Sequence, residues 1–194
     1  MPNWCHNNLI VSGPSEDVKR FVSAARGRRH TYNHFDDNKW DVFDDIRIRS
    51  IVSSPPPLSD RIDELSFHAL YPIPDKVRCY PYDPGNAIEI AKITGEENVV
   101  CGYTWENSNW GVKWGACDSY SSYEEGSNVA HYDFDTPWGP ACEWHSKVAE
   151  DWPTLCFTLN WEEPGVAQTG TIVWQDGCLF SEETNEIEWE NEEE

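Results

Sequence analysis

The sequence has no uninterrupted apolar run that approaches the roughly 20 residues needed to span a membrane as a helix. Its N-terminus, Met1-Pro-Asn-Trp-Cys-His6, lacks the basic and apolar regions of a secretory signal. These two absences argue against membrane insertion and export. We therefore expect the protein to act in the cytoplasm of the cell in which it is made, without a membrane partner.

The motifs of the common enzyme classes are also missing. There is no GxGxxG, no phosphate-binding Gly-Lys-Ser/Thr loop, no GxSxG and no HExxH. The seven cysteines are odd in number and have no CxxC spacing, so we expect reduced, mostly buried thiols. Cys142 and His145 have the spacing of a metal-ligand pair but lack a second close pair. We expect no metal, no cofactor and no enzymatic activity.

Basic residues are scarce in the second half of the chain. The protein has 35 acidic and 14 basic residues, for a net charge of −21. Residues 1–92 carry 12 bases and 13 acids, whereas residues 93–194 carry only Lys113 and Lys147 against 22 acids. Removing the eight Glu of residues 181–194 still leaves −12 between residues 94 and 180. Such a surface repels nucleic acid and attracts a basic protein surface.

The chain does contain many aromatic residues, including 11 Trp. Its 194 residues are enough for a hydrophobic core, and we expect that core to be rich in aromatic side chains. Apolar periodicity and turn residues predict the order βαβ, an aromatic link, then βαββ. The expected strands are 8–13, 65–71, 128–135, 155–161 and 170–174, with a possible short strand at 46–52; the expected helices are 15–25, with Ser15 as its cap, 87–93 and 141–151. This order favours an α+β fold, a mainly antiparallel sheet with helices on one face. We expect one domain, 1–180, with an insertion at about 28–60 and a flexible acidic tail at 181–194.

Several segments resemble the YubB-type ferredoxin-like family of phage and plasmid proteins. They are Met1-Pro-Asn-Trp-Cys-x-Asn, Phe67-x-x-Leu-x-Pro-x-Pro74, Asn109-Trp-Gly-Val-Lys-Trp114, Phe134-x-Thr-Pro-Trp-x-Pro140 and Trp161-x-Glu-x-Gly165 leading to Gly170. The sequence departs from the family pattern at Trp161, at Gln168 and in segment 28–60. The resemblance implies a ferredoxin-like sheet and an origin on a mobile element. It implies no activity and transfers no catalytic residues.

Two groups of side chains are candidates for a local site. His131, Asp133 and Asp135 alternate, so a strand would place them on one face, either as a polar outer surface or as an acid–base or metal site. Trp110, Lys113 and Trp114 form either a packed aromatic plug or a ligand cleft in which a single cation reads an anion. We favour the structural alternative for both groups.

The sequence leaves three functions open. The favoured hypothesis is a DNA-mimic-like inhibitor of a host nucleic-acid-binding defence complex, in an anti-restriction or anti-CRISPR role. Its partner-binding surface would use the acids Glu124, Glu125, Asp133, Asp135, Glu162 and Glu163. The second is an enzyme or small-ligand-binding protein that uses the Trp110/Lys113/Trp114 cleft. The third is an assembly component that pairs through an open sheet edge.

Overall fold

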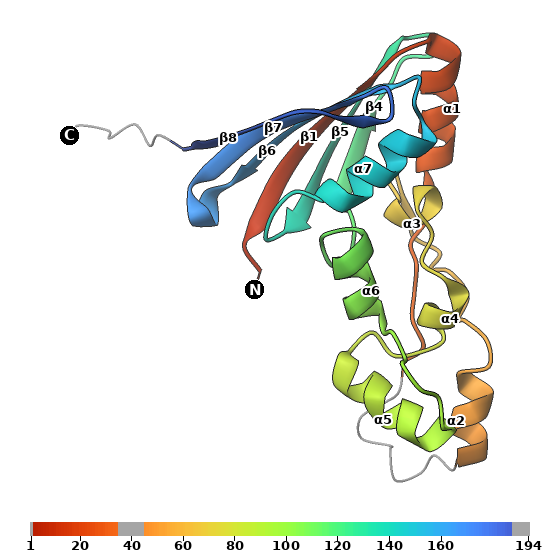
Figure 1. Ribbon diagram of the computed structural model, residues 1–194. Helices are drawn as coiled ribbons and strands as arrows, with labels where there is room; N and C mark the ends of the chain where they lie inside the picture. The colour runs from red at the N-terminus through yellow and green to blue at the C-terminus, as the bar shows by residue number, and fades with distance from the viewer. Residues whose placement is uncertain (1, 35–44, 188–194) are drawn as a thin grey trace.

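The structure is a computed structural model that describes residues 2–34 and 45–187. Its largest element is a six-stranded antiparallel sheet. The strand order is β4-β5-β1-β6-β7-β8 (Figure 1). The strands are β1 (Trp4–Ser12), β4 (Cys117–Ser122), β5 (Val129–Pro137), β6 (Cys156–Glu163), β7 (Gln168–Gln175) and β8 (Cys178–Glu186). Helices α1 (Ser15–Ala25) and α7 (Cys142–Asp151) lie against the same face of this sheet. Strands β1, β4, β5 and β6 with these two helices form a βαββαβ unit, so the predicted α+β, ferredoxin-like fold is confirmed.

The first helix forms where apolar periodicity predicts it. Val18, Phe21 and Ala25 are buried on one side of α1, and Glu16 lies in its first turn, where a carboxylate favours the positive end of the helix dipole. The cap is a detail in which the prediction was wrong. Pro14 is the residue before the helix, and no side chain caps its first turn. The fixed backbone angle of proline starts the helix in place of the predicted Ser15 hydroxyl.

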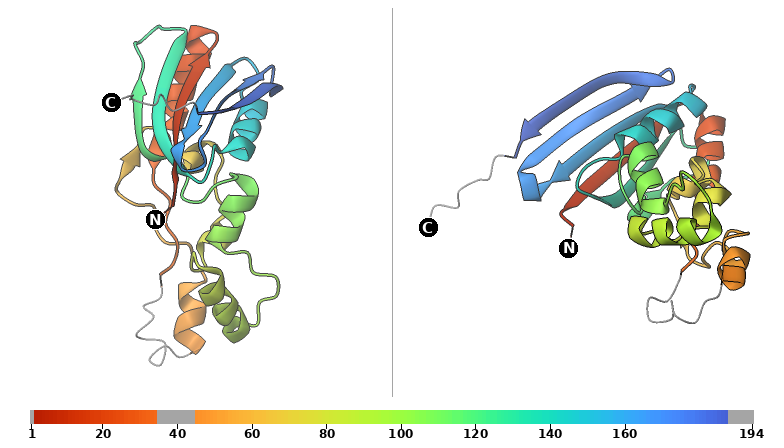
Figure 2. Two further views of the ribbon diagram at one scale, coloured as in Figure 1. Left: turned by 90° about the vertical axis from the view of Figure 1, so that its left-hand side faces the viewer. Right: turned by 60° about the horizontal axis from the view of Figure 1, so that its bottom comes forward.

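The insertion is far larger than the predicted 28–60, because it fills the whole interval between α1 and β4. It contains β2 (Gly27–Arg28), α2 (Asp45–Ile51), β3 (Ile62–Asp63), α3 (Phe67–Leu70), α4 (Asp75–Arg78), α5 (Pro84–Thr94) and α6 (Gly102–Asn109). Strands β2 and β3 pair as a separate two-stranded ribbon. Figure 2 shows α2, α5 and α6 extending beyond one end of the sheet. A small second core there includes Ile48, Tyr80 and Ile90.

Two segments predicted as strands are helical. In residues 46–52, helix α2 packs Ile48 against α5, and the Arg49 guanidinium donates to the carbonyl oxygens of Ile93 and Thr94 at the end of α5. In residues 65–71, the hydroxyl of Ser66 accepts from the backbone N–H of Ala69 and so caps α3. Both segments are only seven residues long and mix apolar with polar residues, so alternation over such a short window does not separate strand from helix. The true second strand of the ferredoxin-like unit is β4.

The C-terminal residues 181–186 belong to the sheet rather than to a flexible tail. β8 runs antiparallel to β7 through to Glu186, which pairs with Gln168, and the Ile187 N–H donates to Ala167. Gly170 allows this pairing, since a β-carbon there would overlap the backbone carbonyl of Glu183. The remaining part of the predicted tail, 188–194, lies outside the described residues.

The core between sheet and helices is aromatic, as the composition predicts. Phe67 stacks on Trp144 with ring centroids 3.9 Å apart, and Trp110 meets Phe67 edge-on at 5.6 Å. The Trp144 indole N–H donates to the Phe67 carbonyl, so the polar atom of a buried ring is paired. Phe67 therefore fastens the inserted helices to α7. No helix in the described ranges is long and apolar enough to cross a bilayer.

Candidate functional site

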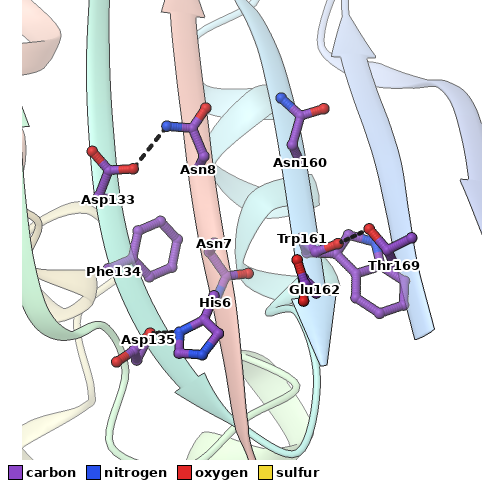
Figure 3. A pocket seen from close by; sticks show the side chains of 10 residues that line it. All are labelled: His6, Asn7, Asn8, Asp133, Phe134, Asp135, Asn160, Trp161, Glu162 and Thr169. Carbon is purple, nitrogen blue, oxygen red and sulfur yellow. Dashed lines mark hydrogen bonds and ion pairs between the residues drawn. The ribbon is translucent and has the colours of Figure 1, made fainter. Parts of the chain in front are cut away.

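The face of the sheet opposite α1 and α7 is polar and is not covered by any described helix (Figure 1). Burial alternates along β1 and β5, so every second side chain faces away from the core. Six of these outward side chains, drawn in Figure 3, are here named the open-face site. They are His6, Asn8, Asp133, Asp135, Asn160 and Glu162. They come from β5, β1 and β6, three strands that neighbour each other in the sheet.

The ladder brings the open-face site into two rows. His6 lies opposite Asp135 on one side and Glu162 on the other, and its Nδ1 is 2.7 Å from the Asp135 carboxylate. Asn8 lies between Asp133 and Asn160, and its amide donates to Asp133 at 2.8 Å. The rows line a shallow depression of about 350 Å³. The carboxylates of Asp133, Asp135 and Glu162 and the amides of Asn8 and Asn160 are among its lining groups, so the arrangement suits a ligand that brings positive charge or hydrogen-bond donors.

The six acids predicted as a partner-binding surface do not form one face. Asp133, Asp135 and Glu162 lie together in the open-face site. Glu124 and Glu125 lie in the turn between β4 and β5, where Glu125 pairs with Lys19 at 2.7 Å. Glu163 points to the core side, is 3% exposed, and has one carboxylate oxygen without a hydrogen-bond partner among the described residues. For Glu163 the prediction of a surface contact was wrong, because the strand alternates and Glu162 takes the outer position.

Ion pairs formed in the folded protein neutralise part of the negative charge that the sequence gives to residues 94–180. Five of the acids there contact Lys or Arg side chains: Glu96, Asp118, Glu125, Glu150 and Asp151. Three of the partners, Lys19, Arg61 and Lys76, come from the N-terminal half of the chain. Lys147 serves both Glu150 and Asp151 on α7. The uncompensated negative charge is therefore more local than the sequence count suggests, and Glu162 is part of it.

The predicted cleft of Trp110, Lys113 and Trp114 does not form as a unit. Trp110 is fully buried in the main core, as the structural alternative predicted. Lys113 and Trp114 lie at the surface, where two further indoles join them. The Lys113 ammonium is 4.0 Å from the ring centroid of Trp114 and 5.8 Å from that of Trp138, and the Trp4 and Trp114 centroids are 6.3 Å apart. Lys113, Trp4, Trp114 and Trp138 are here named the tryptophan cluster.

The tryptophan cluster adjoins the open-face site. Trp4 is two residues before His6 on β1, hence on the same face, and it pairs with Pro137, the last residue of β5. Trp138 follows directly, and its backbone N–H donates to the Asn3 carbonyl at 3.0 Å. The acidic depression and the exposed indoles therefore form one continuous surface at this end of the sheet.

Two of the exposed tryptophans have a strained backbone. Trp114 and Trp138 have φ values of 70° and 75°, in the left-handed region that a bulky side chain rarely adopts. Such residues cost on the order of 1–3 kcal/mol each and persist where the surroundings fix them. Trp114 is fixed by Glu106, whose carboxylate accepts its backbone N–H at 2.6 Å.

Glu106 is a buried carboxylate with four donors. It is 0% exposed, and besides Trp114 it contacts His30 at 2.9 Å and accepts from the hydroxyls of Tyr32 and Tyr82 at 2.6 and 3.1 Å. Burial, with the neighbouring Glu106 charge, raises the pKa of both tyrosines. These four contacts satisfy the hydrogen-bonding capacity of the buried Glu106 carboxylate. It ties the insertion to the segment that presents Trp114.

The possible metal site is not assembled within the described residues. His131, Asp133 and Asp135 do share the outer face of β5, as their alternation predicted. His145 instead lies in the core between Phe134 and Trp174, where burial lowers its pKa to about 4. Within residues 2–34 and 45–187, no three His, Cys, Asp or Glu side chains are grouped to hold a metal ion. All seven cysteines are free; three are buried, three half-buried, and Cys178 is exposed.

Sequence reasoning missed His6, Asn8 and Asn160 in the open-face site. Their signal is alternation in Trp4-Cys-His-Asn-Asn8, where every second residue is polar or aromatic and outward. This alternation shows which side chains face outward, but the strand order β5-β1-β6 is needed to show that they lie beside those of β5 and β6. Trp4 and Trp138 were missed for the same reason, since they are 134 positions apart in the printed sequence.

Comparison with known proteins covers part of this surface. Residues 109–194 match the family model described as the ferredoxin-like domain in Api92-like protein. Among solved structures, the chain is similar to the crystal structure of a protein api92 from Yersinia pseudotuberculosis. The sequence identity is 12%, the TM-score is 0.61, and the match covers 97% of this chain and 99% of that one. The likeness therefore covers the inserted helices as well. No curated protein matches the sequence.

Proposed function

We propose that the protein is a non-enzymatic binding protein that uses the open-face site to engage a basic segment of a macromolecular partner. The observation that carries this proposal is the convergence of Asp133, Asp135 and Glu162 on a sheet face that the described helices leave uncovered. Across that face, the amides of Asn8 and Asn160 supply further hydrogen-bonding groups. Lys and Arg side chains of a partner would find both charge and acceptors there.

The binding test uses a labelled lysine decapeptide, with fluorescence anisotropy measured at 50 and 500 mM NaCl. We expect binding at low salt that weakens steeply at high salt, because exposed charges are screened. The variant Asp133→Asn/Asp135→Asn/Glu162→Gln should bind at least tenfold more weakly. The matched control, Glu124→Gln/Glu143→Gln/Asp176→Asn, removes the same number of exposed charges elsewhere and should bind as the unmodified protein does. Equal loss in both variants would reject the open-face site in favour of overall charge.

The biological role we propose is inhibition of a host nucleic-acid-binding defence complex, in the cytoplasm, by a protein of mobile-element origin. Support comes from the resemblance to the YubB-type family and from the net charge of −21. The open-face site mixes amides with carboxylates, so it fits a local basic segment better than the whole length of a nucleic-acid groove. Capture from host lysate at low and high salt, followed by mass spectrometry, tests this role. A salt-sensitive partner that duplex DNA displaces supports it, and a partner indifferent to DNA contradicts it.

A further inference from the structure

The ammonium group of Lys113 has an unusual environment for so acidic a protein. Within the part of the chain that the structure describes, Lys113 makes no ion pair, whereas Lys19, Lys76 and Lys147 each contact a carboxylate. It lies instead over two indole rings, at 4.0 Å from Trp114 and 5.8 Å from Trp138. The faces of these rings attract a cation through their electron density.

The rings around this ammonium remain largely exposed. The exposed fractions of Trp4, Trp114 and Trp138 are 36%, 39% and 58%. Large apolar side chains gathered at the surface mark interaction sites. Trp110, which is close to Trp114 in the sequence, is fully buried in the core. The three exposed indoles are therefore not part of the core packing.

The backbone holds two of these rings in place at a cost in strain. Trp114 and Trp138 both have left-handed φ values, and their N–H groups are held by the Glu106 carboxylate and the Asn3 carbonyl. Strain of this kind collects at functional sites, where the surrounding structure enforces it. The buried Glu106 carboxylate therefore fixes the backbone of Trp114, and the hydrogen bond to Asn3 at the end of the sheet fixes that of Trp138.

We propose that Trp4, Trp114 and Trp138 form a binding site for the ammonium group of a lysine on the partner, and that Lys113 occupies this site in the free protein. The inference rests on the proposed function and names the residue of the basic segment that binds at the end of the sheet. The partner's ammonium displaces that of Lys113, which moves into solvent. Asp135, next to the cluster on β5, adds a carboxylate that favours a second cation nearby.

The test uses tetramethylammonium chloride as the probe, with sodium chloride at equal ionic strength as the reference, and follows the indole N–H signals by NMR. Lys113→Met empties the site and should bind tetramethylammonium about two- to fivefold more tightly than the unmodified protein, the range expected of one exposed cation–π contact. Lys147→Met removes the same charge on α7 and should leave the affinity unchanged. Adding Trp138→Leu to Lys113→Met should abolish the gain, whereas adding Tyr120→Leu, at another exposed ring, should not.

Two results would overturn the inference: an equal gain in Lys113→Met and Lys147→Met, or equal shifts of the indole signals with sodium. Either is separable from failure of the proposed function. If the lysine decapeptide still binds and still responds to the open-face variant, the basic-segment function stands and only the ammonium site is lost. If decapeptide binding is absent while Lys113→Met meets every expectation above, the rings bind ammonium but the proposed partner chemistry is wrong.

Discussion

The buried His145 makes the stability of the protein depend on pH in a defined window. Its ring is 1% exposed, its Nδ1 donates to the Ala141 carbonyl at 2.7 Å, and burial lowers its pKa from 6.5 to about 4. Between these two pKa values the unfolded chain binds a proton that the folded protein does not. Stability therefore falls as the pH is lowered from about 6.5 to about 4. From pH 7 to pH 4.5 the loss from this group is about 2 kcal/mol.

Urea unfolding followed by tryptophan fluorescence at pH 7.0, 6.0, 5.0 and 4.5 measures this loss. The informative variant is His145→Phe, which keeps a flat ring between Phe134 and Trp174 and removes the proton-binding group. The backbone N–H of residue 145 still pairs the Ala141 carbonyl. We expect the variant to lose about 2 kcal/mol less than the unmodified protein between pH 7.0 and 4.5. Acidic groups common to both proteins cancel in this comparison.

The control is Phe157→Leu, a truncation in the same core without a titrating group. It should lower stability by a similar amount at every pH, leaving the slope of the unmodified protein. If His145→Phe kept the full acid-induced loss, the neutral buried imidazole would not be its source. His68, whose pKa burial also lowers to about 4, adds in the same direction, by less, because it is only partly buried.

Three further outcomes follow from the packing. Glu106→Ala should lower the free energy of unfolding by about 3 kcal/mol in urea titrations, because its buried donors lose their acceptor; no change would contradict its role as an anchor. Deleting residues 178–194 should lower Tm and cause aggregation seen by light scattering, since it uncovers the β7 edge; an unchanged Tm would contradict this. In a thiol-reagent assay Cys178 should react first and Cys5 only after unfolding, because burial raises the pKa of Cys5 to about 12; early reaction of Cys5 would contradict this.

Elements with a strong local pattern were predictable from sequence. The helix at 15–25 and the strand at 128–135 each alternate or repeat clearly enough to identify type and buried side, and both are confirmed. The strand at residues 178–186 was missed because its side chains are all exposed, so no apolar alternation marks it. It forms through backbone pairing with β7, and its many Glu residues made the segment look like a solvated tail.

The candidate site was harder to predict for a different reason. The alternation of Asp133 and Asp135 gives their face but not their neighbours, and it is β1, passing between β5 and β6, that sets His6 beside Asp135. The tryptophan cluster depends on left-handed residues at Trp114 and Trp138. Aromatic residues disfavour that conformation, so local preference argues against the observed geometry.

Net charge was the strongest bulk property of the sequence, but the fold shows that it does not identify where a charged binding surface lies. Asp118 and Glu125 belong to the acidic half of the sequence, yet each contacts a base from the other half. A surface potential depends on the pairs that folding creates, whereas a count along the chain treats every charge as free. The open-face site is distinguished by position rather than by number. Its three carboxylates lie on β5 and β6, the two strands that flank β1, next to exposed indoles and on a face that the described helices do not cover. That juxtaposition, and not the value of −21, is what directs the mutations proposed above.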